Sequence, residues 1–144
     1  MGAGQQLPQS GTAFISVNNH DKANVVPIAR GLADLGFTIM ATRGTAVYLR
    51  AHGIDAEIVY KINEGRPHVG DEIVNKRIAL VINTPLGRES FFDDRAVRRA
   101  AMLQGIPAIT TLTGASAAVS AIAALRSEGL SVKSLQEYHG GAAR

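Results

Sequence analysis

The sequence alternates five times between a short apolar run and a longer amphipathic segment. Alternation of this kind favours an α/β fold whose strands form a parallel sheet. One run, at 78–82, is apolar throughout, which is typical of a strand buried on both faces. We therefore predict an open, parallel, five-stranded sheet with helices on both faces. The expected strands span 12–17, 37–41, 56–60, 78–82 and 108–109.

The spacing of apolar residues and the terminating glycines predict helices between and after these strands. The expected helices span 22–35, 45–51, 69–76, 93–104 and 113–125. Pro27 disturbs the first helix, because proline is comfortable only in the first turn, so we expect that helix to start late or to kink. Residues 113–125 are apolar nearly all round, which predicts a buried helix. Glu137 lies in a terminal element of unassigned type.

The chain has 144 residues and no cysteine, so it fits one domain without a disulfide scaffold, a thiolate metal site or a cysteine nucleophile. No apolar run approaches the roughly 18 residues of a membrane span, and no signal peptide opens the sequence. We expect a cytoplasmic domain over 12–139, a linker or cloning remnant over 1–11, and a frayed tail over 140–144. Because the start is linker-like, we expect the chain to be excised from a longer protein.

The formal net charge of +3 fits a small anionic ligand better than a nucleic acid. A nucleic-acid binder would gather its positive charge in a patch. Here the densest basic stretch, Arg95, Arg98 and Arg99, follows two aspartates and has the spacing of a solvated helix face. Aromatic residues make up 5% of the chain and tryptophan is absent, so base stacking on a single strand is poorly supported.

Hydroxyl, amide and cationic side chains follow the predicted strands. Ligands of open parallel sheets bind beyond the carboxyl ends of the strands, so these side chains suit a phosphorylated polar ligand. Residues 42–45 (TRGT) form the strongest local motif, because a tight turn into a helix points free backbone N–H groups at an anion, and Gly44 permits close approach. A threonine before a helix is also, and more commonly, a plain N-cap.

Lys22 and Lys61 lie near strand ends, where an ammonium group can reach a phosphate. Lys22 opens a helix whose dipole disfavours positive charge there, and a bound anion would compensate this mismatch. Each lysine alone is more simply explained as solvated. His68 follows Arg66-Pro67 in a loop, with a ligand contact and a loop cap as equal alternatives. The four histidines lack metal-ligand spacing, and no serine-hydrolase, P-loop or dinucleotide-binding motif is present.

Six motifs, in this order, together resemble the methylglyoxal-synthase-like superfamily. They are SVxxxDK at 16–22, ATxGTA at 41–46, KxxEGRPH at 61–68, INTPxGR at 82–88, DxxxRR at 94–99 and TTLTG at 110–114. Within that superfamily the set resembles the regulatory domain that ends the large subunit of carbamoyl phosphate synthetases. The resemblance runs from about Gly11 to His139 and implies a Rossmann-like fold.

In bacterial members of that family the domain binds UMP as an inhibitor and IMP, within an ATP-dependent ligase that supplies carbamoyl phosphate to pyrimidine and arginine synthesis. The resemblance implies a non-catalytic segment without a cofactor or metal, and neither a nucleic acid nor a membrane as partner. The implied partners are the ATP-grasp domains of the same subunit, the glutaminase small subunit and a homo-oligomer contact. The resemblance places the nucleotide phosphate at Lys22, Thr42, Thr45 and Lys61, and completes the pocket with Ser16, Asn83 and Arg88.

Two places in the chain depart from the family pattern. Pro85 stands where the family often has a hydroxyl residue, so we expect one ligand hydrogen bond fewer. The ornithine contacts that the family has before Thr110 are a tyrosine and an aspartate, and here they are Ala108 and Ile109. This departure puts activation by ornithine in doubt.

The alternative that the residues leave open is methylglyoxal synthase, which removes phosphate from dihydroxyacetone phosphate. That related enzyme needs carboxylates as base and acid, one of them directly before a Pro-Leu pair at the end of the fourth strand. Here Thr84 precedes the pair, and threonine cannot act as a general base near neutral pH. Asp71 resembles the other catalytic aspartate and keeps the alternative open. The related inosinate cyclohydrolase domain fits less well.

Overall fold

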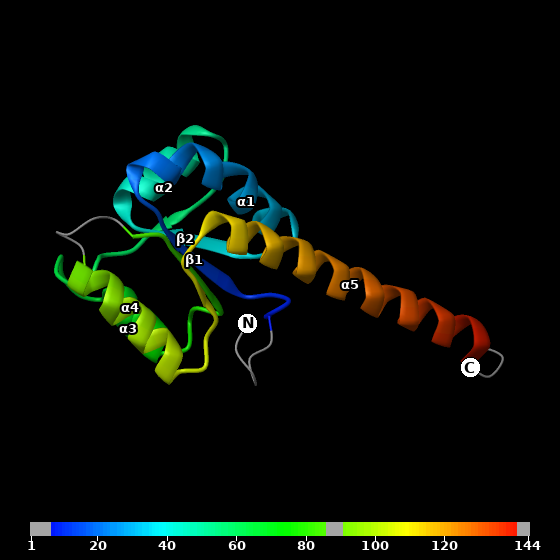
Figure 1. Ribbon diagram of the computed structural model, residues 1–144. Coiled ribbons are helices and arrows are strands. Elements are labelled where there is room, and N and C mark those ends of the chain that lie inside the picture. The colour runs from blue at the N-terminus through cyan, green and yellow to red at the C-terminus, as the bar shows by residue number, and fades with distance from the viewer. Residues whose placement is uncertain (1–6, 86–90, 141–144) are drawn as a thin grey trace.

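The computed structural model describes the backbone of residues 7–85 and 91–140 (Figure 1). It describes the side chains of residues 7–85 and 93–128. The strands are β1 (Thr12–Ser16), β2 (Thr38–Ala41), β3 (Glu57–Ile58), β4 (Leu80–Asn83) and β5 (Ala108–Ile109). The helices are α1 (Lys22–Asp34), α2 (Arg43–Ala51), α3 (Val69–Val74), α4 (Phe91–Leu103) and α5 (Leu112–Gly140), with a 3₁₀ turn, η1 (Asn19–Asp21), before α1.

The five strands form one parallel sheet in the order β3-β2-β1-β4-β5. β1 lies at the centre and pairs with β2 on one side and with β4 on the other. The chain therefore winds outwards in one direction after β1 and in the other after β4. The predicted fold class is confirmed, and the topological switch point lies between β1 and β4.

Helices cover both faces of the sheet, and each layer has its own core (Figure 1). α1, α2 and α5 pack on one face, against Ile15 of β1 and Leu80 and Ile82 of β4. α3 and α4 pack on the other face, against Phe14 and Val81. Alternate residues of each central strand thus point into opposite cores, which explains the uninterrupted apolar run at 78–82. A fully buried side chain of this size stabilises the fold by about 1.5–3 kcal/mol.

α1 begins at Lys22 and contains Pro27, so the expected late start is wrong. The predicted apolar stripe of this helix is confirmed, since Val25, Ile28, Ala29 and Leu32 are all buried. Gly36 follows the helix with a φ of 93°, a left-handed conformation that glycine adopts without strain. This turn brings the chain back to β2 at the central part of the sheet.

α5 differs from the prediction of a buried helix over 113–125. It begins at Leu112, and only one stripe of it faces the sheet, with Ala115, Ala118 and Ile122 buried. Other small residues of this segment, including Ala117, Ala123 and Ala124, are exposed. Alanine gives the strongest helix propensity and exposes little apolar area, so its abundance indicated the helix but not its burial. The terminal element that contains Glu137 is the continuation of α5, which extends beyond the sheet in Figure 1.

The two ends of the domain are tied to its core at a few points. Leu7, in the stretch predicted to be a linker, packs against the core that contains α5. Arg126 donates to the carbonyl of Leu35 at the end of α1. Gly140 is the last residue of α5, and the rest of the predicted tail lies outside the described residues. Among the described helices, none combines the length and hydropathy that crossing a membrane requires.

We predict that Ile122→Ala lowers the free energy of unfolding by about 2–4 kcal/mol, because it removes a fully buried side chain and leaves a cavity between α5 and the sheet. Leu125→Ala on the same helix is the matched control, since Leu125 is 41% exposed, and should cost less than about 1 kcal/mol. Urea unfolding followed by circular dichroism measures both. Equal losses would contradict the single buried stripe.

Candidate functional site

A cleft of about 270 Å³ opens at the carboxyl ends of β1 and β2. Its walls come from the turn after β1, from the start of α2 and from the loop after β3. The lining residues are Val17, Asn18, Asn19, Lys22, Thr42, Gly44, Thr45 and Lys61. The structure therefore brings together four of the predicted phosphate contacts, the two lysines and the two threonines, although they are spread over 40 positions of the sequence.

Lys22 enters the cleft from the first residue of α1. Its Nζ lies 2.5 Å from the side-chain oxygen of Asn19 and 3.5 Å from the carbonyl of Val17. Partial burial, and secondly the charge of Lys61, lower the pKa of Lys22 below its ordinary value. Among the described residues neither lysine forms an ion pair with a carboxylate. The cleft therefore holds two positive charges that a bound anion would stabilise.

The start of α2 supplies the opposite wall of the cleft. Thr42 occupies the N-cap position, but its hydroxyl does not cap the helix and instead donates to Oγ of Ser16 at 3.3 Å. The plain N-cap interpretation of this threonine is thus wrong, because the first-turn N–H groups of α2 receive no bond from it. A Cβ atom on Gly44 would lie 3.7 Å from Nζ of Lys22, so the missing side chain keeps the helix start open towards the lysine.

Thr45 is fixed by the strand beside it. Its hydroxyl oxygen accepts from the backbone N–H of Val17 at 3.3 Å, and its side chain is almost fully buried. The bond joins the start of α2 to the end of β1, 28 positions away. The position of the helix N-terminus relative to the lysines is therefore set by the sheet and not by the loops alone.

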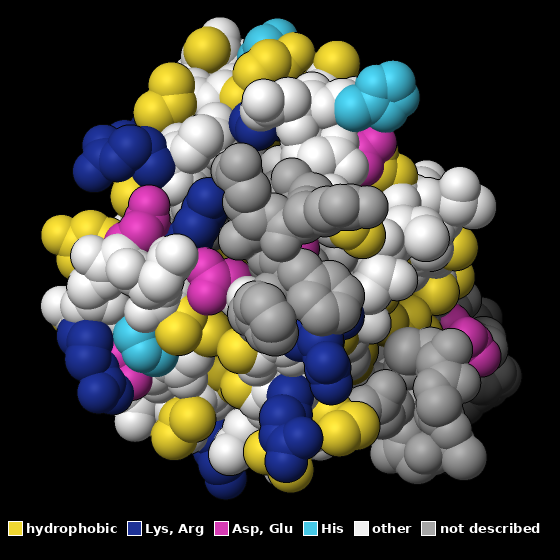
Figure 2. Space-filling model, turned by 60° about the vertical axis from the view of Figure 1, so that its left-hand side comes forward, with side chains coloured by type: hydrophobic (Ala, Val, Ile, Leu, Met, Phe, Trp, Pro, Cys, Tyr) yellow, Lys and Arg dark blue, Asp and Glu magenta, His cyan; other side chains and the backbone are white. Residues whose placement is uncertain are grey.

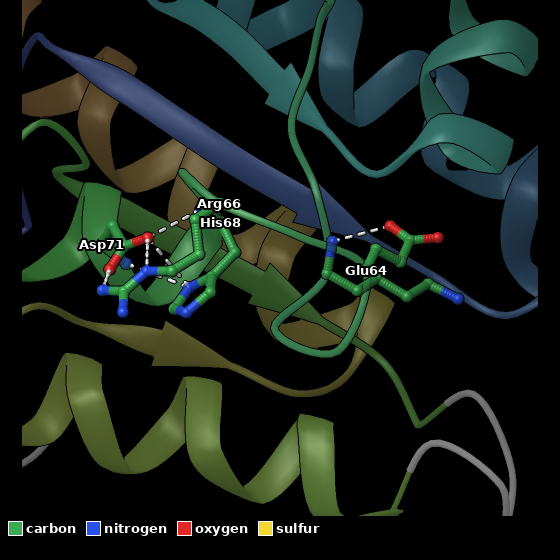
Figure 3. A network of polar contacts seen from close by, with 5 residues as sticks. Glu64, Arg66, His68 and Asp71 are labelled. Carbon is green, nitrogen blue, oxygen red and sulfur yellow. Dashed lines mark hydrogen bonds and ion pairs between the residues drawn. The ribbon is translucent and has the colours of Figure 1, made fainter.

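The loop that carries Lys61 is held by its own polar side chains (Figure 3). Glu64 accepts from the backbone N–H of Lys61 at 2.8 Å, which closes a short turn. Arg66 and His68 both contact Asp71, and His68 caps α3 in a reciprocal pair with Asp71. Of the two interpretations of His68, the loop cap is the one observed. Most of the polar residues of the 61–68 motif therefore stabilise the loop that carries Lys61.

Asp71 therefore has a structural role, since it pairs with Arg66 and caps α3 together with His68. The Arg66 guanidinium, and secondly the backbone N–H of His68, lower the pKa of Asp71 to about 2. A carboxylate with so low a pKa is a weak base, which disfavours a role in proton abstraction. Nor is Asp71 among the residues that line the lysine cleft.

A second, much smaller cavity of about 10 Å³ continues from the cleft towards β4 and α4. It shares Thr42 and Lys61 with the cleft, and it adds Ser16 and Asn83. Asn83 is 1% exposed, and its amide nitrogen donates to Asp94 at 3.4 Å. Its amide oxygen has no hydrogen-bond partner among the described residues. A buried acceptor without a partner is costly, so this oxygen suits a ligand that brings an N–H or O–H donor.

Comparison with known proteins assigns the chain to a family. Residues 24–110 match the family model described as the MGS-like domain, which is more than half of the chain. The chain belongs to this family. The matched segment contains Thr42, Thr45, Lys61 and Asn83.

Relatives of this MGS-like domain are large chains of carbamoyl phosphate synthase. The protein of that name from Acidobacterium capsulatum is 54% identical over 141 residues, which cover 98% of this chain and 13% of the relative. The relative from Nostoc is 48% identical, over 96% of this chain and 12% of its own length. A protein from Methanopyrus kandleri named as the C-terminal section of the large chain is 48% identical, over 98% and 26%. The chain thus spans about an eighth of the full-length relatives.

Solved structures agree with the fold of an MGS-like domain. A methylglyoxal synthase from Elizabethkingia anophelis superposes with a TM-score of 0.63 at 19% identity, over 79% of this chain and 80% of that one. The protein ForH superposes with a TM-score of 0.55 at 18% identity, over 78% and 79%. At these identities the likeness concerns the fold alone.

The remaining predicted positions are the nucleotide contact Arg88 and the two positions of the family's ornithine contacts. Arg88 lies outside the described residues. Ala108 and Ile109 line a groove of about 560 Å³ between β5 and α5, and no lysine, arginine or carboxylate is among its lining residues. A larger hollow, about 810 Å³ between α1 and α5, has no lysine or arginine among its described lining residues. The smaller lysine cleft is therefore the better anion site, because charge rather than volume decides the binding of a phosphate.

Other classes of site find little support in the described part of the molecule. No group of three His, Asp or Glu side chains there has a metal-binding arrangement. On the face shown in Figure 2, Lys and Arg side chains lie in separate groups interspersed with carboxylates and apolar residues. This arrangement is unlike the continuous basic patch that a nucleic-acid surface requires. The cleft residues outside the predicted contact set are Val17, Asn18, Asn19 and Gly44.

We predict a distinct pH dependence for Asp71→Asn. Because the folded pKa of about 2 lies below the ordinary value of 3.8, the aspartate stabilises the fold above pH 4, and this contribution disappears as the pH falls towards 2. Urea unfolding at pH 6 should show a less stable variant, and the difference should narrow between pH 4 and 2. Asp55→Asn, at an exposed position, is the control. A difference that stayed constant with pH would argue against the Arg66–Asp71 pair as its cause.

Proposed function

We propose that this chain is the nucleotide-binding regulatory domain of a glutamine-hydrolysing carbamoyl phosphate synthase large chain. In this proposal UMP and IMP compete for the lysine cleft and adjust the supply of carbamoyl phosphate to pyrimidine and arginine synthesis. The segment is not catalytic by itself. It acts on the ATP-grasp domains of the same large chain and, through them, on the glutaminase small subunit. The similarity to large chains from several organisms supports this assignment.

The observation that carries the proposal is the pair of lysines at the start of α2. Lys22 and Lys61 share one cleft with the open N-terminus of a helix, and neither forms an ion pair with a described carboxylate. Asp93 and Asp94 line the small adjoining cavity together with Lys61. A phosphate monoester is a dianion near neutral pH with three acceptor oxygens. It therefore matches two ammonium groups and the free N–H groups of the helix start better than a monoanion does.

We propose that the base lies on the side of the cleft nearest Asn83, where the small cavity of about 10 Å³ has room for about one water molecule and would have to widen to admit a base. A phosphate at the lysines would direct the nucleoside past Thr42 and Lys61 towards Asn83. The unpaired oxygen of Asn83 requires a donor. Uracil and hypoxanthine each carry a ring N–H beside a carbonyl, so both bases can donate to it. This shared feature is a reason why UMP and IMP would use the same pocket.

Ornithine fits the observed side chains less well. Its two charged ends need a carboxylate or another polar partner, and the residues at the family's contact positions are Ala108 and Ile109. We propose that these two positions contribute no ornithine contact in this domain. Regulation would then rest on the nucleotide, whose preference between two loop arrangements biases the rest of the enzyme.

Calorimetric titration of the chain with UMP in phosphate-free buffer tests the proposal. We expect saturable binding that IMP competes with, and Lys61→Met should weaken UMP about 10- to 100-fold, since it removes one charge-assisted contact. Lys76→Met is the matched control, because Lys76 is exposed and lies outside the cleft. Absence of UMP binding by the unmodified chain would overturn the proposal. Equal effects of the two variants would overturn the site assignment.

The same preparation distinguishes this function from that of methylglyoxal synthase. We expect no release of phosphate from dihydroxyacetone phosphate above the uncatalysed rate, because Thr84 stands where a carboxylate is needed and Asp71 is paired with Arg66. A colorimetric phosphate assay over a range of pH measures this directly. If the chain released phosphate and Asp71→Asn abolished that release, the chain would instead be a methylglyoxal synthase.

A further inference from the structure

The two halves of the proposed nucleotide site lie on opposite sides of the switch point. The lysine cleft belongs to the loops after β1, β2 and β3, whereas Asn83 ends β4. After β1 the chain turns into α1 on one face of the sheet, and α4, which follows β4 in the chain, packs on the other face. The chain therefore leaves the two neighbouring strands for helices on opposite faces of the sheet. The sheet pairs Ser16 with Asn83, and beyond these residues other bonds must fix the two strand ends if one ligand is to contact both.

Asn18 makes two hydrogen bonds to the turn after β4 and a third, through its side chain, within its own turn. Its backbone N–H donates to the hydroxyl of Thr84 at 3.1 Å, and its side-chain nitrogen donates to the carbonyl of Pro85 at 3.0 Å. Its side-chain oxygen accepts from the backbone N–H of Asp21, the last residue of η1, at 2.8 Å. A backbone N–H can only donate, so the oxygen must face Asp21 and the nitrogen must face Pro85.

These bonds reach both ends of the proposed ligand. Asp21 directly precedes Lys22, so the bond to Asp21 orients the turn that brings Nζ of Lys22 into the cleft. Thr84 directly follows Asn83, and its hydroxyl is bonded while its side chain is 2% exposed. The backbone N–H of Thr84 also donates to the carbonyl of Ser16 at 3.1 Å. Asn18 thus extends the β1–β4 pairing beyond the end of the strands.

We propose that Asn18 is a positioning residue that holds the phosphate end and the base end of the cleft in one fixed arrangement. The inference rests on the proposed nucleotide-binding function and adds to it a residue outside the predicted contact set. Asn18 acts through Lys22 on one side and through the Thr84–Pro85 turn, and so Asn83, on the other. Its contribution is preorganisation: without the bond to Pro85, the turn after β4 is less firmly fixed relative to Lys22 and must be ordered when the nucleotide binds.

Asn18→Ser separates the two roles of the side chain. Serine can still accept from the N–H of Asp21, as N-cap serines do, but it is too short to reach Pro85 and offers no amide donor. We expect the variant to bind UMP about 3- to 10-fold more weakly, the effect of losing about one hydrogen bond. Ribose 5-phosphate, which lacks the base, should change less than about twofold. Competition calorimetry measures both ligands on the 144-residue chain.

Thr84→Val tests the same connection from the β4 side and should give the same selective loss of UMP affinity. Asn24→Ser, an equal substitution on the exposed face of α1, should leave both affinities unchanged. Equal weakening of UMP and ribose 5-phosphate by Asn18→Ser would overturn the inference, since Asn18 would then serve the phosphate turn alone. No effect on either ligand would also overturn it. Failure of the unmodified chain to bind UMP is a different result, which rejects the proposed function itself.

Discussion

The site depends on the repulsion between the ammonium groups of Lys22 and Lys61, which line one cleft. Neither group forms an ion pair with a described carboxylate. Burial and the charge of Lys61 both disfavour the charged form of Lys22, as its lowered pKa indicates. An arrangement of this kind persists only where the surrounding structure enforces it. Here the enforcing elements are the first residue of α1 and a loop stiffened by the contacts of Glu64 and Asp71. The stability of the sheet maintains a local repulsion that a dianionic ligand would relieve.

The sheet achieves this because all its strands are parallel. Every strand ends at the same edge, so residues that are distant in sequence meet there without any local preference for one another. The bonds from Thr42 to Ser16 and from Val17 to Thr45 fasten the start of α2 to the central strand. These bonds keep the N-terminus of α2 next to the two lysines. Positive charge and helix dipole therefore act at the same place.

The sequence predicted the parts of the molecule that periodicity or strand order determines. The buried run at 78–82 required two cores, and the convergence of strand ends required Lys22, Thr42, Thr45 and Lys61 to meet. The burial of α5 was wrongly predicted, because alanine marks a helix without marking which side packs. The bonds of Asn18 to Thr84 and Pro85 were not predicted, since these partners lie 66 and 67 positions away in a turn that no pattern reveals. Contacts between loops depend on tertiary geometry, which periodicity does not encode.

The end of β4 shows how one family fold can serve either chemistry or recognition. The resemblance to methylglyoxal synthases expects a carboxylate before the Pro-Leu pair, where it would face the substrate as a base or acid. Thr84 in that place is buried, and its hydroxyl accepts from the backbone of Asn18. The position thus joins two loops and offers no group that can move a proton at neutral pH. Asp71 is likewise held by Arg66. In the proposed function the cleft would therefore keep the positive charges of its two lysines, while Thr84 and Asp71 make structural contacts.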